Sequence, residues 1–273
     1  ILARRSMPQS DWRKLKQHCD GLKLAFFATV GFPDEVDFLE EIGCHSVKIA
    51  SADINHYPLI RYAAQRLPSI QIDTGNATIG EVEAAVDVIR RAGRDEVVIH
   101  HCPSGYPARL ESINLRIIPT LKTMFDLPIA YSDHTPGWDM DIAAIALGAN
   151  MVEKTISLDR TTPSVEHIMS LEGDELPRFV GVIRDLEAAF GSPRRVMHSA
   201  EVRKRDDVQF LTLCTDETAE DETRGTALTL QTAVGFLLTL VTIRAVPAIA
   251  QAVDESGDAG GGQQQQRPTT RIG

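Results

Sequence analysis

The sequence predicts an α/β fold in which parallel strands alternate with helices, a (β/α)8 TIM barrel of which about six β/α units are present. Three observations lead to it. Short apolar, β-branched runs recur at intervals of 22 to 32 residues through the first two-thirds of the chain. Amphipathic stretches separate them, and a crossover helix of that length makes the next strand run parallel. No GxGxxG or GxxxxGK(S/T) turn is present, which removes the commonest reason for a nucleotide-binding open sheet.

The expected elements alternate regularly. Strands are expected over 24–29, 46–50, 70–73, 96–100, 128–131 and 150–153, and helices over 10–19, 34–42, 78–92, 114–125 and 139–147. The helix at 78–92 opens on a capping box, Thr78-Ile-Gly-Glu81, and ends at Gly93. The helix at 10–19 would follow an earlier strand, so we expect two further units upstream of Ile1.

Composition divides the chain near Asp206. Residues 1–206 carry the alternating pattern and are assigned to the partial barrel. Residues 207–273 are expected to be an unassigned tail, disordered or non-native, because 214–224 are acidic and threonine-rich and 254–273 are rich in Gly and Gln. The segment 225–243 has no charge, but its threonines and Gln231 favour a buried or improperly folded segment over a membrane helix.

Charge and cysteine content limit the partners and the compartment. The chain has 28 Lys and Arg against 38 Asp and Glu, a net charge of -10, so it offers no basic footprint for nucleic acid. Cys19, Cys44, Cys102 and Cys214 are widely spaced, which favours a reducing cytoplasm over a disulfide scaffold. The N-terminus lacks the apolar core of a signal peptide. We therefore expect a cytoplasmic protein that binds neither nucleic acid nor membranes.

Polar side chains follow almost every expected strand. They are Thr29; Lys48 and Ser51; Asp73 and Thr74; His101, Ser104 and Tyr106; Ser132, Asp133 and His134; and Glu153 and Lys154. The carboxyl ends of barrel strands meet at one mouth, where barrel enzymes carry their chemistry. We expect these side chains to converge on a single site.

Lys48 lies inside an apolar strand, where an unpaired ammonium is costly to bury. It therefore needs an anionic ligand or, as the alternative, an ion pair with a carboxylate of a neighbouring strand. Together with the hydroxyls of Thr29, Ser51, Ser104 and Ser132, it favours a phosphate or carboxylate ligand. A small phosphorylated acid fits this set of donors.

His134 follows a strand and precedes Pro136-Gly137, so it is expected on a loop at the rim of the site. Its imidazole could bind a divalent metal or shuttle a proton, and a purely structural role is the alternative. Of the adjacent pair His100 and His101, at most one can reach the barrel mouth, because neighbouring strand residues point to opposite faces.

Several motifs occur together over roughly residues 10–199. They are Phe32-Pro-Asp-Glu-Val-Asp-Phe-Leu-Glu40, Val47-Lys-Ile-Ala-Ser-Ala-Asp-Ile-Asn55, Tyr57-Pro-Leu59, Asp73-Thr-Gly-Asn-Ala-Thr78, His101-Cys-Pro-Ser-Gly-Tyr-Pro107, Tyr131-Ser-Asp-His-Thr135, Ala146-Leu-Gly-Ala149 and Val152-Glu-Lys154. Each motif is weak alone. In this order and spacing they resemble the sialic acid synthase family, which comprises N-acetylneuraminate synthase and its legionaminic and pseudaminic acid relatives.

The resemblance implies a transferase that condenses phosphoenolpyruvate with an N-acetylated hexosamine, such as N-acetylmannosamine, to form a nonulosonic acid and phosphate. A divalent metal, Mn²⁺ or Mg²⁺, would polarise the sugar aldehyde. The third carbon of phosphoenolpyruvate would attack it, water would add to the resulting oxocarbenium ion, and phosphate would leave by C–O cleavage. The resemblance also allows a homodimer.

The resemblance implies roles only for those residues of this sequence that lie at positions matching the family's motifs. Thr29, Lys48, Ser51 and Ser132 would contact phosphoenolpyruvate, with Ser104 where many relatives carry Asn. Tyr106 would line the sugar site, and His134 would hold the metal. Lys48, Asp53 and Glu166 are the expected catalytic residues.

The sequence also departs from the family pattern. Thr155 stands where relatives carry the second metal-ligating His, so Glu166 or His167 supplies that ligand, or metal binding is weaker or absent. Asp53 replaces the usual Glu, and Glu166 stands where Gly-Pro-Asp-His is common. An acidic residue and a lysine of the family's site are expected upstream of Ile1, and residues 208–273 lack the pattern of the family's small antifreeze-like domain.

Two other functions stay open at this point. The chain could be an inactive barrel fragment or a pseudoenzyme that acts only by binding. It could also be a Schiff-base aldolase using Lys48, which is less favoured because the surrounding hydroxyls suit an anion better than the dry pocket that a neutral amine needs.

Overall fold

The computed structural model describes residues 7–205. The chain divides into two compact units, Ile1–Gly191 and Ser192–Gly273, and each is described by itself. In the second unit residues 199–205 are helical. The predicted tail at 207–273, with its uncharged segment at 225–243, lies outside the described residues. Within residues 7–205, no helix combines the length and the apolar character needed to cross a membrane.

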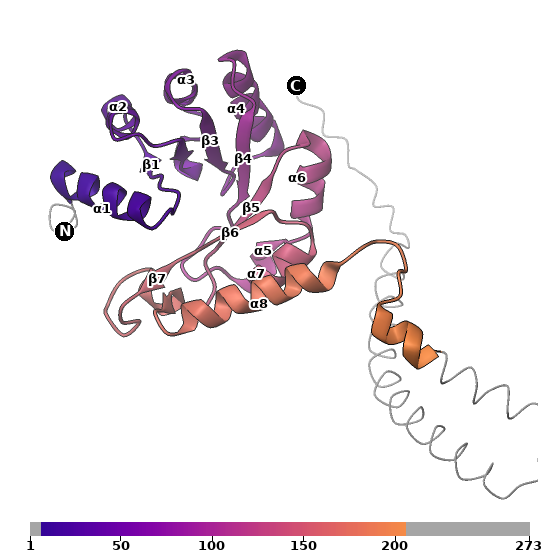
Figure 1. Ribbon diagram of the computed structural model, residues 1–273. Coiled ribbons are helices and arrows are strands. Elements are labelled where there is room, and N and C mark those ends of the chain that lie inside the picture. Colours follow the sequence, from indigo (N-terminus) through magenta and orange to yellow (C-terminus); the bar gives the residue numbers. More distant parts are fainter. Residues whose placement is uncertain (1–6, 206–273) are drawn as a thin grey trace, which may run out of the picture. The chain divides into compact units, whose positions relative to one another are not determined.

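Six parallel strands form one sheet in the order of the sequence. They are β1 (Thr29–Val30), β2 (Ser46–Ile49), β3 (Ser69–Asp73), β4 (Glu96–His101), β5 (Ile129–Asp133) and β6 (Met151–Lys154). Each connection advances by one position, without the reversal that marks a doubly wound sheet. The sheet also curls, as Figure 1 shows. The predicted fold class, consecutive units of a (β/α)8 barrel, is therefore confirmed.

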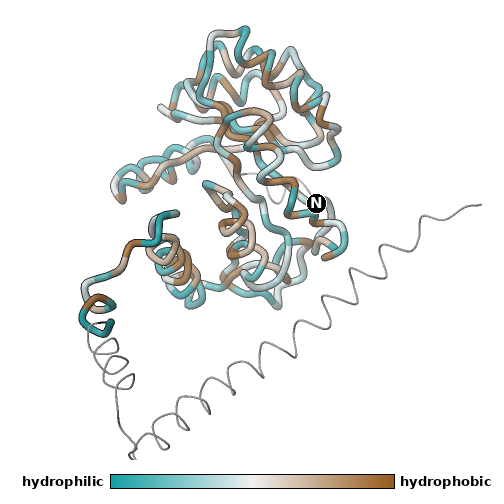
Figure 2. The backbone as a smooth tube through the Cα atoms, turned by 90° about the vertical axis from the view of Figure 1, so that its right-hand side faces the viewer, coloured by the Kyte–Doolittle hydropathy of each residue, from teal (hydrophilic) through white to brown (hydrophobic). Residues whose placement is uncertain are grey.

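Helices connect these strands. They are α1 (Gln9–Gly21), α2 (Pro33–Glu41), α3 (Tyr57–Arg66), α4 (Ile79–Arg91), α5 (Leu110–Ile113), α6 (Ile117–Phe125), α7 (Asp139–Ala146) and α8 (Glu175–Phe190). The first unit also contains two short 3-10 helices, η2 (Ser51–Asp53) and η3 (His167–Met169), and a parallel pair, β7 (Ile156–Ser157) and β8 (Leu171–Glu172). Hydrophilic and hydrophobic residues alternate along the helices in Figure 2.

The side chains of the central strands alternate between an apolar outer face and a polar inner face. On the outer face Val47, Ile49, Ile70, Ile72, Val97, Ile99, Ile129 and Tyr131 are almost fully buried in the core formed with the helices. The inner face carries Lys48, Gln71, Asp73, His100, Ser132 and Glu153. Apolar burial stabilises the layer of helices against the sheet, and the curl brings the inner polar side chains toward one another.

Three local expectations need correction. The first strand is only Thr29–Val30 rather than 24–29, and residues 24 and 25 are exposed. The helix expected over 114–125 begins only at Ile117, because Asn114 adopts a left-handed conformation with φ of 51° at the end of the separate helix α5. Helices α3 and α8 were not expected. The Thr78 capping box is confirmed, since Thr78 N donates to Glu81 Oε2 at 2.8 Å and Glu81 N donates to Thr78 Oγ1 at 3.3 Å.

Candidate active site

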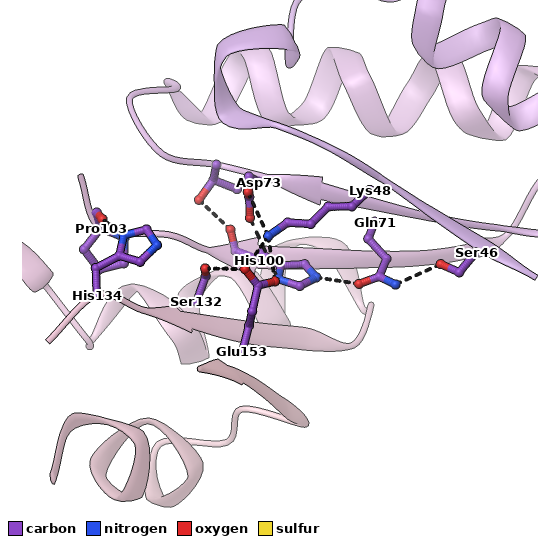
Figure 3. A network of polar contacts seen from close by, with 10 residues as sticks. Ser46, Lys48, Gln71, Asp73, His100, Pro103, Ser132, His134 and Glu153 are labelled. Carbon is purple, nitrogen blue, oxygen red and sulfur yellow. Dashed lines mark hydrogen bonds and ion pairs between the residues drawn. The ribbon is translucent and has the colours of Figure 1, made fainter. Parts of the chain in front are cut away.

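Lys48 is the centre of a buried cluster on the inner face of the sheet. Only 5% of the residue is exposed. Its Nζ donates to both carboxylate oxygens of Glu153, at 2.8 and 2.6 Å, and lies 3.0 Å from Asp73 Oδ2. Glu153 comes from β6 and Asp73 from β3, so the contacts cross the inside of the curl, as Figure 3 shows. The ion pair that the sequence left open as an alternative for Lys48 is therefore present.

We call Lys48, Asp73, His100, Ser132 and Glu153 the Lys48 cluster. The Ser132 hydroxyl is buried and donates to Glu153 Oε1 at 3.1 Å. The His100 ring is fully buried, with Nδ1 3.4 Å from Glu153 Oε2 and 3.8 Å from Asp73 Oδ1. The cluster thus joins side chains from β2, β3, β4, β5 and β6 at one place.

Burial and charge oppose each other in this cluster. Burial alone would lower the pKa of the Lys48 ammonium, but the carboxylates of Asp73 and Glu153 outweigh it and raise that pKa. Burial would raise the pKa of Glu153, but His100 and Lys48 lower it to about 2. For Asp73, burial prevails over the attraction of Lys48 and raises the pKa. Lys48 is thus held as a cation and Glu153 as an anion.

The other three hydroxyls predicted to surround Lys48, those of Thr29, Ser51 and Ser104, are not members of the cluster. Thr29 is the strand partner of Lys48 in the register of β1 with β2, which places it on the same face, but it is exposed. Ser51 begins η2 directly after β2 and packs against Gly75. The hydroxyl of Ser104 is exposed and donates to Asn76 Oδ1 at 2.8 Å. Of the four predicted hydroxyls, only that of Ser132 donates a hydrogen bond to a carboxylate of the cluster.

His134 lies on the loop after β5, as expected, and is only 8% exposed. Its Nδ1 lies 3.0 Å from the carbonyl of Pro103, so Nδ1 carries the proton and donates it. The ring of Tyr106 lies against it, with the ring centroids 4.5 Å apart. Burial raises the pKa of Tyr106. His134 therefore presents Nε2 beside the predicted sugar-contacting residue.

The described residues do not fit a complete metal site. His134 is oriented as a metal-ligating histidine usually is, with Nδ1 donating to a carbonyl. Within residues 7–205, however, no group of three His, Cys, Asp or Glu side chains is placed to hold an ion. Thr155, at the position of the family's second histidine, has a buried hydroxyl without a hydrogen-bond partner among the described residues.

The remaining predicted residues lie outside the Lys48 cluster. Asp53 ends η2, and its carboxylate makes no hydrogen bond or ion pair within the described part of the chain. Glu166 is exposed just before η3, and its charge contributes to the raised pKa of Tyr106. The Nδ1 of His167 lies 3.1 Å from the carbonyl of Thr162. Catalytic roles for Asp53 and Glu166 stay predictions.

Sequence reasoning missed two members of the inner face, Gln71 and Ser46. His100 points into the cluster, while the ring of His101 points away and contacts the carbonyl of Ile113 at 2.6 Å, so the expectation that only one of the pair faces inward is confirmed. Neither Gln71 nor Ser46 was singled out, although Gln71 is hydrogen-bonded to His100 and Ser46 is hydrogen-bonded to Gln71. The spacing could have found them, because strand residues two positions apart point to the same face: Ser46 shares the face of Lys48, and Gln71 shares the face of Asp73.

Comparisons with known proteins show the family of this chain. Residues 1–195 match the model of the NeuB family. The N,N'-diacetyllegionaminic acid synthase of Campylobacter jejuni is 35% identical over 181 residues, which are 66% of this chain and 54% of that protein. The N-acetylneuraminate-9-phosphate synthase of Homo sapiens is 30% identical over 192 residues, 70% of this chain and 53% of that protein.

A solved structure is similar as well. It is the N-acetylneuraminic acid (sialic acid) synthetase of Leptospira borgpetersenii serovar Hardjo-bovis, with a TM-score of 0.68 and 28% identity over 78% of this chain and 73% of that one. The chain spans about half of the length of the curated relatives that it matches. Because the family model covers most of the chain, the chain belongs to the NeuB family.

Proposed function

We propose that this chain carries the phosphoenolpyruvate site of a synthase that joins phosphoenolpyruvate to an N-acetylated amino sugar, forming a nonulosonic acid and releasing phosphate. The observation that carries the proposal is the buried, charged Lys48 ammonium on the inner face of parallel strands, beside Ser132. Membership of the NeuB family supports it, as do the synthases among the relatives.

The residues of the Lys48 cluster would act on the anion. An incoming phosphate or carboxylate would take the place of Glu153 at the Lys48 ammonium, because the Glu153 side chain is 38% exposed whereas that of Asp73 is 10% exposed. Ser132 would then donate its hydroxyl to the ligand instead of to Glu153. The third carbon of phosphoenolpyruvate would attack the sugar aldehyde, water would add at the second carbon, and phosphate would leave with the bridging oxygen.

The charged state of Lys48 disfavours the aldolase alternative. Formation of a Schiff base needs a neutral amine, and the carboxylates of Asp73 and Glu153 raise the pKa of Lys48. We therefore expect no covalent adduct when the full chain is treated with a keto acid and borohydride. An adduct that disappears in Lys48→Arg would favour the aldolase.

The direct test measures phosphate release by the full chain. Phosphoenolpyruvate, Mn²⁺ and N-acetylmannosamine or its 2,4-diacetamido analogues are supplied, with Lys48→Ala as the test variant and Lys122→Ala as the control. Lys122 is exposed and donates to Gly148 O and Asn150 Oδ1, away from the cluster. Release that depends on Lys48 and not on Lys122 supports the synthase. A folded chain that binds phosphoenolpyruvate without release would favour the pseudoenzyme.

Metal binding at His134 stays a proposal and has its own test. Calorimetric titration with Mn²⁺ or Mg²⁺ alone, on the full chain and on His134→Ala, measures binding without any catalytic readout. Binding that is lost in the variant supports His134 as a ligand. Equal binding by both would place the ion elsewhere.

A further inference from the structure

A chain of hydrogen bonds determines the protonation of Nε2, one of the two ring nitrogens of His100. Gln71 Nε2 donates to Ser46 Oγ at 2.8 Å, and Ser46 Oγ in turn donates to Ser69 Oγ at 3.4 Å. The amide oxygen of Gln71 therefore faces His100, with Oε1 2.8 Å from Nε2. A carbonyl oxygen can only accept, so Nε2 of His100 carries a proton.

The other ring nitrogen faces two carboxylates. Nδ1 lies 3.4 Å from Glu153 Oε2 and 3.8 Å from Asp73 Oδ1, and within the described residues neither Nδ1 nor Asp73 Oδ1 has a hydrogen-bond partner. The ring is fully buried, where electrostatic interactions are strong. A lone pair at Nδ1 would be repelled by both carboxylates, whereas an N–H would be attracted by both.

The net charge of the Lys48 cluster also favours a positively charged His100 ring. The titratable groups that surround the ring are Asp73 on β3, Glu153 on β6 and Lys48 on β2; Gln71 and Ser132 are neutral. With a neutral ring and both carboxylates ionised, as their contacts with the Lys48 ammonium favour, the cluster would hold one cation and two anions in a buried place. With a charged ring the cluster is balanced, and uncompensated buried charge is avoided.

We propose that His100 is a positively charged positioning residue, which holds the carboxylates of Glu153 and Asp73 so that the ammonium of Lys48 can turn to an anionic ligand. When that ligand displaces Glu153 from Lys48, Glu153 keeps a cationic partner instead of becoming an unpaired anion. The nature of the ligand rests on the proposed function, whereas the charge of the ring rests on the geometry alone.

The charge of the ring is tested by nitrogen NMR of the histidine side chains in the full chain, at a pH of about 7.5, a unit above the ordinary histidine pKa. The chain has eight histidines, so the resonance is assigned by its loss from His100→Gln. Should that variant not fold, Gln71→Leu, which removes the acceptor of Nε2, identifies the resonance by its shift. Two protonated nitrogens support the proposal, and a singly protonated, neutral ring overturns it.

The positioning role is tested by calorimetric titration with phosphoenolpyruvate and, separately, with inorganic phosphate. In His100→Gln we expect the Kd for either anion to rise by about tenfold or more, because one cation of the cluster is lost. His101→Gln is the matched control, since the neighbouring ring points away from the cluster, and its Kd should not change.

The two titrations separate this inference from the proposed function. An unchanged Kd in His100→Gln overturns the positioning role while leaving the anion site standing. If the unmodified chain binds neither anion, the proposed function fails and the positioning role fails with it. The NMR measurement decides the charge of the ring in either case.

Discussion

The Nζ atom of Lys48 lies 2.6 Å from Oε2 of Glu153, although the two residues are 105 positions apart in the sequence. Lys48 stands on β2 and Glu153 on β6, at the far edge of the sheet. The ion pair therefore spans the inside of the curl and joins strands that share no backbone hydrogen bonds. We expect it to affect the stability of the curled sheet as well as the binding of an anion.

Replacing Glu153 by Gln keeps the size of the side chain and removes its charge. We expect the free energy of unfolding to fall by about 1–3 kcal/mol, less than for a fully buried pair, because Glu153 is partly exposed and Asp73 still pairs with Lys48. Urea denaturation measures this change. Glu96→Gln is the control, because its carboxylate forms an exposed pair with His45, and a loss as large in that variant would contradict the prediction.

The same pair gives stability a defined dependence on acid. The pKa of Glu153 is lowered from 4.5 to about 2, so its contribution is fully present above pH 4.5 and is lost as the pH falls toward about 2. We expect the unmodified chain to lose more stability in this window than Glu153→Gln. Urea denaturation at several pH values measures both curves, and parallel curves would show that Glu153 does not contribute.

Most of the fold could be predicted because local sequence patterns determine where its strands and helices form. The β-branched runs at β2, β3 and β4 and the capping box at Thr78 lie where the sequence places them. Helix α3 was missed although Pro58 lies in its first turn and Leu59, Ile60, Ala63 and Ala64 share its buried face. The split of α5 from α6 depends on a left-handed Asn114, which no periodicity signals.

The candidate site was less predictable because its contacts depend on the curvature of the sheet. Strand alternation places Lys48 on the inner face, but only the curl determines that Glu153 reaches it from β6. His100 and His101 were correctly expected to face opposite ways, yet the sequence could not say which one points inward. Asp53 and Glu166 were chosen by motif alone, and neither contacts the Lys48 cluster.

Lys154 holds the loop that carries His134. Its Nζ donates to the carbonyl of Thr135 at 2.6 Å and to the carboxylate of Asp133, and it lies 3.6 Å from Asp141 Oδ2. Because its side chain is only 3% exposed, Lys154→Met leaves the buried carboxylate of Asp133 without a cation. We expect the free energy of unfolding to fall by about 3–5 kcal/mol, as measured by urea denaturation.

Two further variants test that explanation. Adding Asp133→Asn to Lys154→Met removes the uncompensated charge, so part of the lost stability should return. Lys122→Met, at an exposed position, should change stability little. A Lys154→Met chain as stable as the unmodified one would show that the network does not support this loop.

Asp141 should make the chain less stable as the pH rises. It is fully buried on α7, and burial together with Asp133 raises its pKa from 3.8 to about 8. Between these values the folded state holds a proton that the unfolded state has lost, so the free energy of unfolding falls by up to about 1.4 kcal/mol per pH unit. In Asp141→Asn the contribution of Asp141 to this slope should disappear. The exposed Asp139→Asn, in the same helix, should keep it when both are measured by urea denaturation.

Ser51 packs so closely against Gly75 that position 75 has no room for a side chain. A Cβ atom at position 75 would lie 2.4 Å from Ser51 Cβ and 2.6 Å from Ser51 Oγ, closer than side chains can pack. Gly75→Ala should therefore displace Ser51 and lower the free energy of unfolding by about 1–3 kcal/mol. Adding Ser51→Gly should restore stability, because the next neighbour, Cys102 O, lies at 3.8 Å.

Gly80→Ala is the control. It should not lower the free energy of unfolding, because there is open space around a Cβ atom at this position of α4. Thermal and urea denaturation compare the four chains, and failure of Ser51→Gly to rescue Gly75→Ala would show that Gly75 is needed for another reason.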